Sequence, residues 1–209
     1  MKMNKFLAVA LLAVSAMGIQ TVDAQSLSPS TKWHWDKGTI VIDTPERPAG
    51  QEHVLGLTAA PVKTVRVGFV GLGMRGPSAV IRFCQIPGVE IVALCDYEEK
   101  RAEAQQVHLR NAGLAPAAIY SGEKGYEELC KRPDIDVVYI ATDWNHHFPV
   151  AKCAMENGKH AAIEVPSAMN LEQCWDLINL SEQTRMHCFI LENCCYDDYE
   201  MKSLLMAQD

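Results

Sequence analysis

The sequence lacks an excess of basic residues. Its 19 Lys and Arg stand against 26 Asp and Glu, which gives a formal charge of −7 at pH 7. A nucleic-acid-binding surface needs clustered Lys and Arg, so we expect no nucleic-acid partner. An acidic surface of this kind mainly favours solubility.

The sequence also lacks an apolar run of the length typical of a transmembrane helix. FLAVALLAVSAMGI, from Phe6, is too short for one and follows Lys2 and Lys5. Small residues stand near Ala24, as a signal peptidase requires, and no Cys follows to carry a lipoprotein anchor. We therefore predict a removable signal peptide over residues 1–24 and a periplasmic or secreted protein without a stable membrane anchor. The alternative is a membrane-anchored or cytosolic N-terminal helix.

No C-x-x-C pair occurs among the eight cysteines. Six of them lie within apolar runs, where Cys behaves as a small hydrophobic residue: Cys84, Cys95, Cys130, Cys153, Cys174 and Cys188. Cys194 and Cys195 are adjacent, which is poor geometry for a mutual bridge. We expect mostly free, buried thiols, with a single disulfide left open.

Short apolar runs alternate with helical patterns after a mixed segment, residues 25–63, that we interpret as an N-terminal arm lying on the following domain. The pattern predicts strands at 65–71, 89–95, 137–141, 160–164 and 187–191, and helices at 74–86, 98–111, 122–130, 148–157 and 170–184. This alternation is typical of βαβ units. It predicts an α/β fold, a Rossmann-type doubly wound parallel sheet over residues 64–193. Residues 194–209 begin a further helix, which we interpret as the start of a truncated C-terminal region.

The stretch VRVGFVGLGMRG, from Val65, is either a dinucleotide-binding turn or only a tight turn between two packed elements. Its glycines match the spacing G-x-G-x-x-G. Gly71 permits the tight turn, Gly73 lets a diphosphate approach the backbone, and Gly76 lets helix and strand pack closely. The helix N-terminus that follows offers N–H groups to phosphates. A strand before and a helix after favour the dinucleotide interpretation.

Asp96 ends the next predicted strand, twenty residues after Gly76. A carboxylate there accepts hydrogen bonds from the adenosine ribose and repels a 2′-phosphate, which favours NAD over NADP. Arg101 is close enough in sequence to soften that preference. The alternative role of Asp96 is to cap the helix that begins near Glu98.

Three further polar clusters follow predicted strands: 142–147, 164–166 and 192–193. Together with the glycine turn and Asp96 they fall at the carboxyl ends of parallel strands, the edge where ligands bind. Adjacent histidines seldom reach one ion, so we predict no metal site at His146 and His147. A helix-capping role for Asn145 or His146 stays open, and Glu164 is a candidate general base, ribose contact or residue held by neighbouring backbone.

The runs VGFVGLGMRG, ALCDYEEKRAE, YIATDWNHHFPVAKCAMENGKHAAIEVP and LENCCYDDYEM resemble the N-terminal half of a Gfo/Idh/MocA-type sugar oxidoreductase. More closely they resemble glycoside hydrolase family 109, the NAD-dependent α-N-acetylgalactosaminidases. The resemblance implies a tightly held NAD and cleavage of terminal α-linked N-acetylgalactosamine by oxidation at C3, elimination, water addition and reduction. It leaves open a sugar dehydrogenase of the same superfamily, a non-catalytic NAD-binding fragment, and assembly as a homo-oligomer.

The same resemblance implies which residues contact NAD. Besides Gly71 and Gly73 they are Met74, Arg75, Asp96, Trp144, Asn145, His146, His147, Glu164, Val165 and Asn193. The superfamily's Glu-Lys-Pro motif stands here as Glu164-Val165-Pro166, which argues against a lysine-assisted dehydrogenase. The resemblance implies a C-terminal α/β domain that supplies most substrate contacts, and we expect this domain to be missing from the chain. The catalytic residues are therefore unknown.

Overall fold

The computed structural model describes residues 33–42 and 46–207, so the predicted signal peptide lies outside the described residues. The chain divides into two compact units at Thr44. The first contains a hairpin of β1 (Trp33–Asp36) and β2 (Thr39–Ile42), paired antiparallel. Its turn places Lys37 and Gly38 at φ values of 47° and 85°, the conformation that a two-residue hairpin favours.

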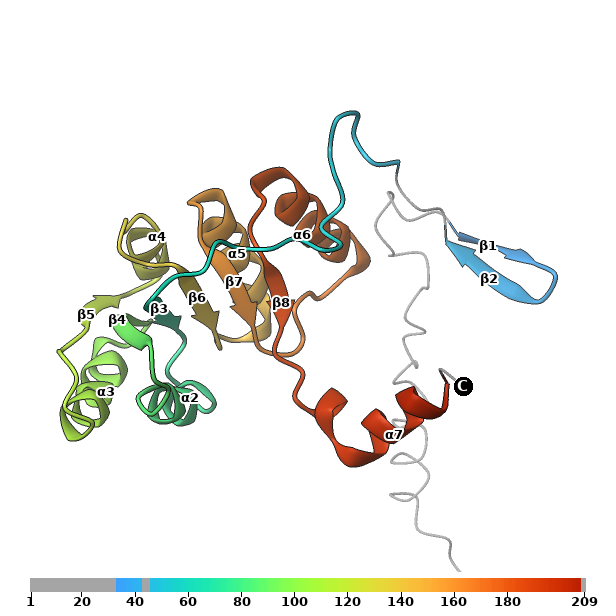
Figure 1. Ribbon diagram of the computed structural model, residues 1–209. Helices are drawn as coiled ribbons and strands as arrows, with labels where there is room; N and C mark the ends of the chain where they lie inside the picture. The colour runs from blue at the N-terminus through green and yellow to red at the C-terminus, as the bar shows by residue number, and fades with distance from the viewer. Residues whose placement is uncertain (1–32, 43–45, 208–209) are drawn as a thin grey trace, which may run out of the picture. The chain divides into compact units, whose positions relative to one another are not determined.

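The second unit is built on a parallel sheet with the strand order β5-β4-β3-β6-β7-β8 (Figure 1). The strands are β3 (Val65–Val70), β4 (Val89–Asp96), β5 (Ala118–Ser121), β6 (Val137–Ile140), β7 (His160–Ile163) and β8 (Cys188–Ile190). The helices are α2 (Gly76–Phe83), α3 (Glu99–Asn111), α4 (Gly125–Cys130), α5 (Trp144–Glu156) and α6 (Leu171–Thr184), followed by the 3-10 turn η2 (Cys194–Tyr196) and α7 (Asp198–Met206). This confirms the predicted Rossmann-type doubly wound fold.

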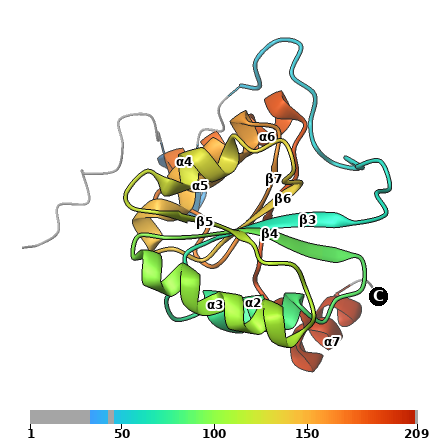
Figure 2. The same cartoon turned by 90° about the vertical axis from the view of Figure 1, so that its left-hand side faces the viewer.

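Helices cover both faces of this sheet (Figure 2). On one face α2 and α3 pack over a core cluster that includes Phe69, Leu94 and Leu109. On the other face α4, α5 and α6 pack over a second cluster that includes Ile140 and Met155. Since both faces are buried, the strands are nearly continuous apolar runs, which is why the sequence pattern located most of them.

Three details differ from the sequence-based expectations. The four-residue strand β5 was not predicted, because AIYS is too short for a periodic signal. Helix α5 begins at Trp144 rather than at Phe148, because Asp143 caps it, and Pro149 is accommodated inside it. All eight thiols are free, but the expectation that most are buried was wrong: only Cys95 and Cys130 are fully buried.

The segment before β3 lies against α6 through polar contacts. Arg47 donates two hydrogen bonds to Glu182, at 2.9 and 3.0 Å. Gln51 donates to Glu182 at 2.7 Å and to Asn179 at 3.1 Å. Glu182 is only 5% exposed, so these contacts neutralise a carboxylate that packing has removed from water.

Asp136 links two neighbouring strands of the sheet, β3 and β6, near the points where they begin. Its carboxylate accepts hydrogen bonds from the backbone N–H of Arg66 at 2.8 Å and from the guanidinium of Arg66 at 2.6 and 3.0 Å. The hydrogen bond from Arg66 is the main cause that holds the pKa of Asp136 below its usual value. These contacts join the start of β3 to the residue before β6.

We expect Asp136→Asn to lower the free energy of unfolding at neutral pH by about 1–2 kcal/mol. Because the folded-state pKa of Asp136 lies below its unfolded value, its contribution is present above the unfolded pKa and is lost as the pH falls through the folded pKa. The difference in the free energy of unfolding between Asp136→Asn and the unmodified chain should therefore become smaller in acid. Thermal unfolding at neutral and acidic pH measures this difference. Glu128→Gln, at an exposed ion pair with Lys131, is the control and should change little. A deficit that stays constant with pH would contradict the assignment.

Candidate functional site

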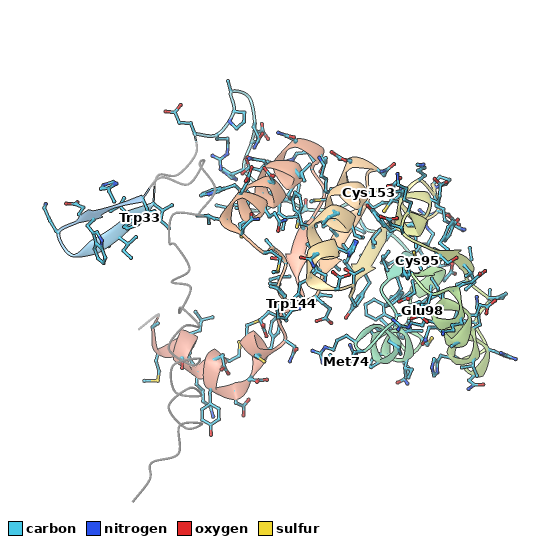
Figure 3. All side chains as sticks on the ribbon, turned by 180° about the vertical axis from the view of Figure 1, so that it is seen from behind. Trp33, Met74, Cys95, Glu98, Trp144 and Cys153 are labelled. Carbon is cyan, nitrogen blue, oxygen red and sulfur yellow. The ribbon has the colours of Figure 1, made fainter. Side chains whose placement is uncertain are left out.

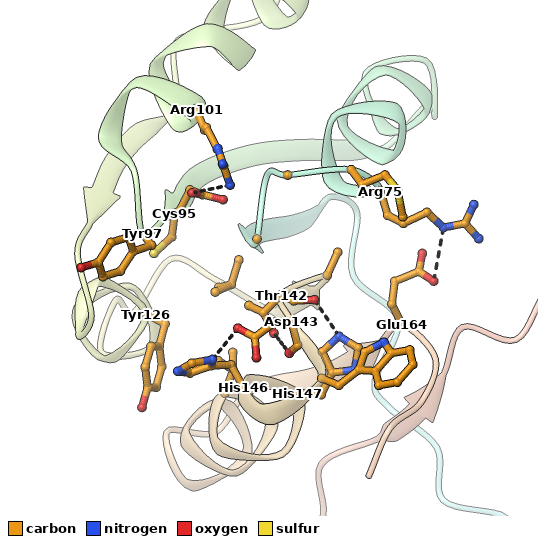
Figure 4. Close-up of a pocket in the computed structure, with 18 of the residues that line it drawn as sticks. Arg75, Cys95, Tyr97, Arg101, Tyr126, Thr142, Asp143, His146, His147 and Glu164 are labelled. Carbon is orange, nitrogen blue, oxygen red and sulfur yellow. Dashed lines mark hydrogen bonds and ion pairs between the residues drawn. The ribbon is translucent and has the colours of Figure 1, made fainter. Parts of the chain in front are cut away.

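A cavity of about 850 Å³ opens at the carboxyl ends of β3, β4, β6 and β7 (Figure 4). The chain runs from β3 outward to β4 and β5, then returns to place β6 on the other side of β3. This reversal is the switch point where open α/β sheets bind ligands. The volume is within the range of small-molecule and cofactor sites.

The glycine turn forms one wall of the cavity, and two of its glycines are fixed by backbone contacts. Gly71 has a φ of 93°, and a Cβ there would overlap the backbone of Ala141 and Thr142. A Cβ at Gly76 would overlap the carbonyl oxygen of Gly71. The predicted roles of Gly71 in the turn and of Gly76 in close helix–strand packing are therefore confirmed.

Gly73 differs from both. A Cβ there would meet only Nη1 of Arg101, at 3.6 Å, so the space above it is open toward the cavity. The backbone N–H groups of Gly73, Met74 and Arg75 meet no acceptor among the described residues. Unpaired N–H groups at the start of a helix are suited to bind the phosphates of a nucleotide.

Asp96 has two roles at the end of β4. It is 6% exposed, and its Oδ2 accepts a hydrogen bond from the backbone N–H of Leu72 at 2.7 Å. Its Oδ1 accepts from the N–H of Glu98 at 3.0 Å, but the N-cap of α3 is Glu98, so the alternative in which Asp96 caps this helix was wrong. The carboxylate thus holds the glycine turn in place and also lines the cavity.

Arg101 partly neutralises Asp96. Its Nη1 lies 3.7 Å from Oδ1 of Asp96, and its Nη2 lies 2.7 Å from Glu98. Lys100 pairs with the same Glu98 at 2.9 Å. The side chains of Asp96, Glu98, Lys100 and Arg101 carry two negative and two positive charges. The net charge at this end of the cavity is therefore close to zero.

The loop after β6 carries Asp143, which caps α5 by accepting a hydrogen bond from the N–H of Asn145 at 3.0 Å. The same carboxylate bonds Nδ1 of His146 at 2.6 Å. Burial alone would raise the pKa of Asp143, but the hydrogen bonds from His146 and Asn145 outweigh it and lower that pKa. The cap is therefore Asp143 and not Asn145 or His146.

His147 joins two loops beneath the cavity. Its ring is 1% exposed, with Nδ1 2.6 Å from the carbonyl oxygen of Pro166 and Nε2 3.2 Å from that of Thr142. These carbonyls belong to the loops that follow β7 and β6. Both ring nitrogens thus face backbone carbonyl oxygens, and the ring links the two loops.

Glu164 and Val165 line the cavity after β7. Glu164 is 8% exposed, and its Oε2 lies 4.0 Å from Nε of Arg75 across the cavity mouth (Figure 4). Val165 presents an aliphatic side chain, which cannot transfer a proton. Met74 and Trp144, both labelled in Figure 3, add large exposed apolar side chains to the same cavity.

Ten of the twelve predicted cofactor-binding residues line this cavity. They are Gly71, Gly73, Met74, Arg75, Asp96, Trp144, His146, His147, Glu164 and Val165. Asn145 and Asn193 are not among the lining residues. Asn193 follows β8 at the edge of the sheet, where the chain turns into η2, so this strand end does not reach the cavity.

Sequence reasoning missed the residues at the β4–β5 end of the cavity. Gly122, Glu123 and Tyr126 line it from the loop after β5 and from α4, and Tyr97 lines it next to Asp96 (Figure 4). Gly122, Glu123 and Tyr126 were missed because β5 was missed. The available signal was a short apolar stretch, AIY, between Pro116 and Gly122.

The described residues contain no group of three His, Cys, Asp or Glu side chains placed to hold a metal ion. Among the same residues, no helix combines the length and the apolar character needed to span a membrane. Burial raises the pKa of the Cys95 thiol to about 12, so this cavity-lining cysteine is a thiol rather than a thiolate at neutral pH.

The fold and the cavity define an NAD-binding Rossmann domain. The family described as the oxidoreductase family with an NAD-binding Rossmann fold, Gfo/Idh/MocA, matches residues 65–191, and the chain belongs to this family. Open space above Gly73 and the unpaired N–H groups beside it fit a dinucleotide diphosphate.

Particular relatives are closer in sequence. The chain is 74% identical over 209 residues to glycosyl hydrolase family 109 protein 3 of Phocaeicola vulgatus and 53% identical over 207 residues to glycosyl hydrolase family 109 protein 1 of Bacteroides thetaiotaomicron. These alignments cover 100% and 99% of this chain but 38% and 43% of the relatives. The predicted resemblance to family 109 is confirmed, and the chain spans less than half the length of these relatives.

One solved structure extends the comparison to a bound cofactor. Myo-inositol dehydrogenase of Lactobacillus casei, in complex with NAD(H) and myo-inositol, has a TM-score of 0.59 and 25% sequence identity. The match covers 69% of this chain and 42% of that chain. The predicted cofactor, NAD, is confirmed at the level of the family and its fold.

We expect Gly73→Ala to leave thermal stability nearly unchanged, because a Cβ there meets no backbone and φ is outside the left-handed range. The same methyl group occupies the path of the diphosphate, so the affinity for NAD should fall about 10-fold or more. Calorimetric titration with NAD and thermal unfolding measure the two effects. Gly76→Ala is the contrast: it should lower both the thermal stability and the NAD affinity, because its Cβ overlaps the carbonyl oxygen of Gly71. A Gly73→Ala chain with unchanged NAD affinity would show that the diphosphate lies elsewhere.

Asp96→Asn and Arg101→Ala should shift cofactor preference in opposite directions. Asp96→Asn removes the carboxylate charge while keeping its size, so we expect about 10-fold weaker NAD binding and a higher ratio of NADP to NAD affinity. Arg101→Ala removes the cation beside Asp96 and should lower that ratio. Parallel titrations with NAD and NADP measure it. Ratios that move in the same direction in both variants would refute this account of the charge balance.

Proposed function

We propose that this chain is the NAD-binding part of a glycosidase that removes terminal α-linked N-acetylgalactosamine from glycans by oxidation, elimination, water addition and reduction. The observation that carries the proposal is the open space above Gly73, with unpaired N–H groups beside it, in a chain 74% identical to a protein named for glycosyl hydrolase family 109. The first 24 residues support export, so we propose a periplasmic or secreted location.

NAD, when bound, supplies reversible hydride acceptance, so that no pair of carboxylates around the glycosidic bond is required. The chain's own residues bind and orient it. The N–H groups of Gly73, Met74 and Arg75 face the diphosphate, and Asp96 faces the adenosine ribose. Trp144 and Met74 provide apolar surface at the cavity mouth.

Val165 favours the glycosidase over a lysine-assisted dehydrogenase. It lines the cavity directly after Glu164, where the wider superfamily carries a lysine. An aliphatic side chain can neither accept a proton from a substrate hydroxyl nor return one. The acid and base for glycoside cleavage must therefore come from other residues.

A sugar dehydrogenase of the Gfo/Idh/MocA type is the second candidate. The observation that favours it is the structural similarity to the myo-inositol dehydrogenase of Lactobacillus casei. The two functions differ in their net chemistry, because a dehydrogenase releases NADH with every turnover, whereas the glycosidase returns its hydride within each cycle.

The test uses a protein of the relatives' full length that contains this chain, with p-nitrophenyl α-N-acetylgalactosaminide as substrate. We expect p-nitrophenol release without net NADH formation, and loss of most of this activity in the Gly73→Ala variant. Steady NADH formation from a free sugar, without p-nitrophenol release, would establish the dehydrogenase instead.

The chain of 209 residues serves as the comparison in the same assay. We expect it to bind NAD in calorimetric titration without cleaving the glycoside. A full-length protein that binds NAD but performs neither reaction would mean that this is a non-catalytic NAD-binding module.

A further inference from the structure

Tyr139 is a buried polar residue outside the set of cavity-lining residues. It lies on β6, is 4% exposed, and donates its hydroxyl to Oε1 of Glu164 at 2.6 Å. Burial is the main cause that raises the pKa of this phenol far above its usual value, and the neighbouring Glu164 raises it further. The phenol is therefore the donor, and the Glu164 carboxylate is the acceptor.

The Tyr139 ring is itself fixed by two aromatic neighbours. Its centroid lies 4.9 Å from that of Phe69 in a stacked pair and 5.4 Å from that of Phe83 in an edge-to-face pair. Phe69 and Phe83 also pack against each other at 5.2 Å. Such a cluster leaves the ring little freedom, so the hydroxyl has one position relative to the end of β7.

The Tyr139 hydrogen bond leaves the two oxygens of Glu164 with different environments. Oε1 accepts the hydrogen bond from Tyr139. Oε2 lies 4.0 Å from Nε of Arg75, which is too far for a hydrogen bond. Oε2 therefore keeps its acceptor capacity, and Glu164 lines the cavity. A carboxylate held in this way can accept a hydrogen bond from a hydroxyl group of a ligand.

The position of Glu164 indicates which part of a ligand it meets. Asp96 lies at the end of β4 and Glu164 after β7, on opposite sides of the glycine turn after β3. A dinucleotide whose diphosphate lies at the glycine turn places its two ribose rings on opposite sides of the switch point. With Asp96 at the adenosine end, Glu164 is at the nicotinamide end.

We propose that Tyr139 is a positioning residue for the cofactor: its hydroxyl holds Glu164 so that Oε2 accepts a hydrogen bond from the ribose diol on the nicotinamide side. This inference rests on the proposed function only through the orientation of NAD in the cavity. It adds a residue that does not touch the cofactor and that acts through Glu164.

The test compares NAD with ADP, which contains the adenosine and the diphosphate but lacks the second ribose. In the unmodified chain and in Tyr139→Phe, both are titrated by calorimetry. The substitution keeps the ring and its packing, so we expect about 10-fold weaker NAD binding and an ADP affinity within about 2-fold of the unmodified chain. Tyr120→Phe is the matched control, because its hydroxyl meets Arg132 at 3.2 Å away from the cavity lining; it should change neither affinity.

A double-mutant cycle separates positioning from general support of the fold. In a Glu164→Gln background, Tyr139→Phe should weaken NAD binding by less than about 2-fold, because the group that Tyr139 positions has already been changed. If Tyr139→Phe does not fold, Phe83→Leu replaces it. This change removes the edge-to-face neighbour of the Tyr139 ring and leaves Glu164 itself unchanged, so it should weaken NAD binding and not ADP binding.

Three results would overturn the inference: an unchanged NAD affinity in Tyr139→Phe, an equal loss for NAD and ADP, or additive effects in the cycle. Each of these leaves the proposed function intact as long as the unmodified chain binds NAD. If the unmodified chain binds no NAD, the proposed function fails, and the role of Tyr139 fails with it.

Discussion

The close approach of backbone to backbone at the glycine turn is the constraint on which the cavity depends. The α-carbon of Gly76 lies against the carbonyl of Gly71, and Gly71 lies against the chain that leaves β6. A side chain at either position would push α2 away from β3 or β3 away from β6. The backbone N–H of Leu72 donates a hydrogen bond to Asp96 on β4 at 2.7 Å, so that three neighbouring strands together hold one turn.

The two-sided core explains why that turn is rigid enough to bind a ligand. Phe69 on β3 and Tyr139 on β6 stack on the face covered by α2, while Ile140 and Val150 pack on the face covered by α5. Side chains that alternate between the two clusters fix the register of β3 against β6. The residues with unpaired N–H groups before α2 therefore line the cavity in a fixed position before any ligand arrives, which reduces the ordering that binding requires.

The sequence predicted the parts of the site that depend on local pattern. Continuous apolar runs located β3, β4, β6 and β7, and glycine spacing with Asp96 located the turn. Four-residue β5 has no periodic signal, and the cavity residues that follow it, Glu123 and Tyr126, were missed with it. The contact between Tyr139 and Glu164 joins residues 25 positions apart on different strands. Such a contact depends on strand order and register, which one sequence without its fold does not specify.

Most charged side chains around the cavity form ion pairs or hydrogen bonds with one another, even without a ligand. Arg101 lies beside Asp96, and His146 is bonded to Asp143 at 2.6 Å. A cofactor therefore meets groups whose directions are already fixed, and few side chains must be ordered at the moment of binding. Paired groups are poor proton shuttles, however, and no lysine is among the cavity-lining residues that the structure describes. This domain is accordingly built to hold and orient a dinucleotide, and the proton transfers of the glycosidase proposed above require groups other than these paired side chains.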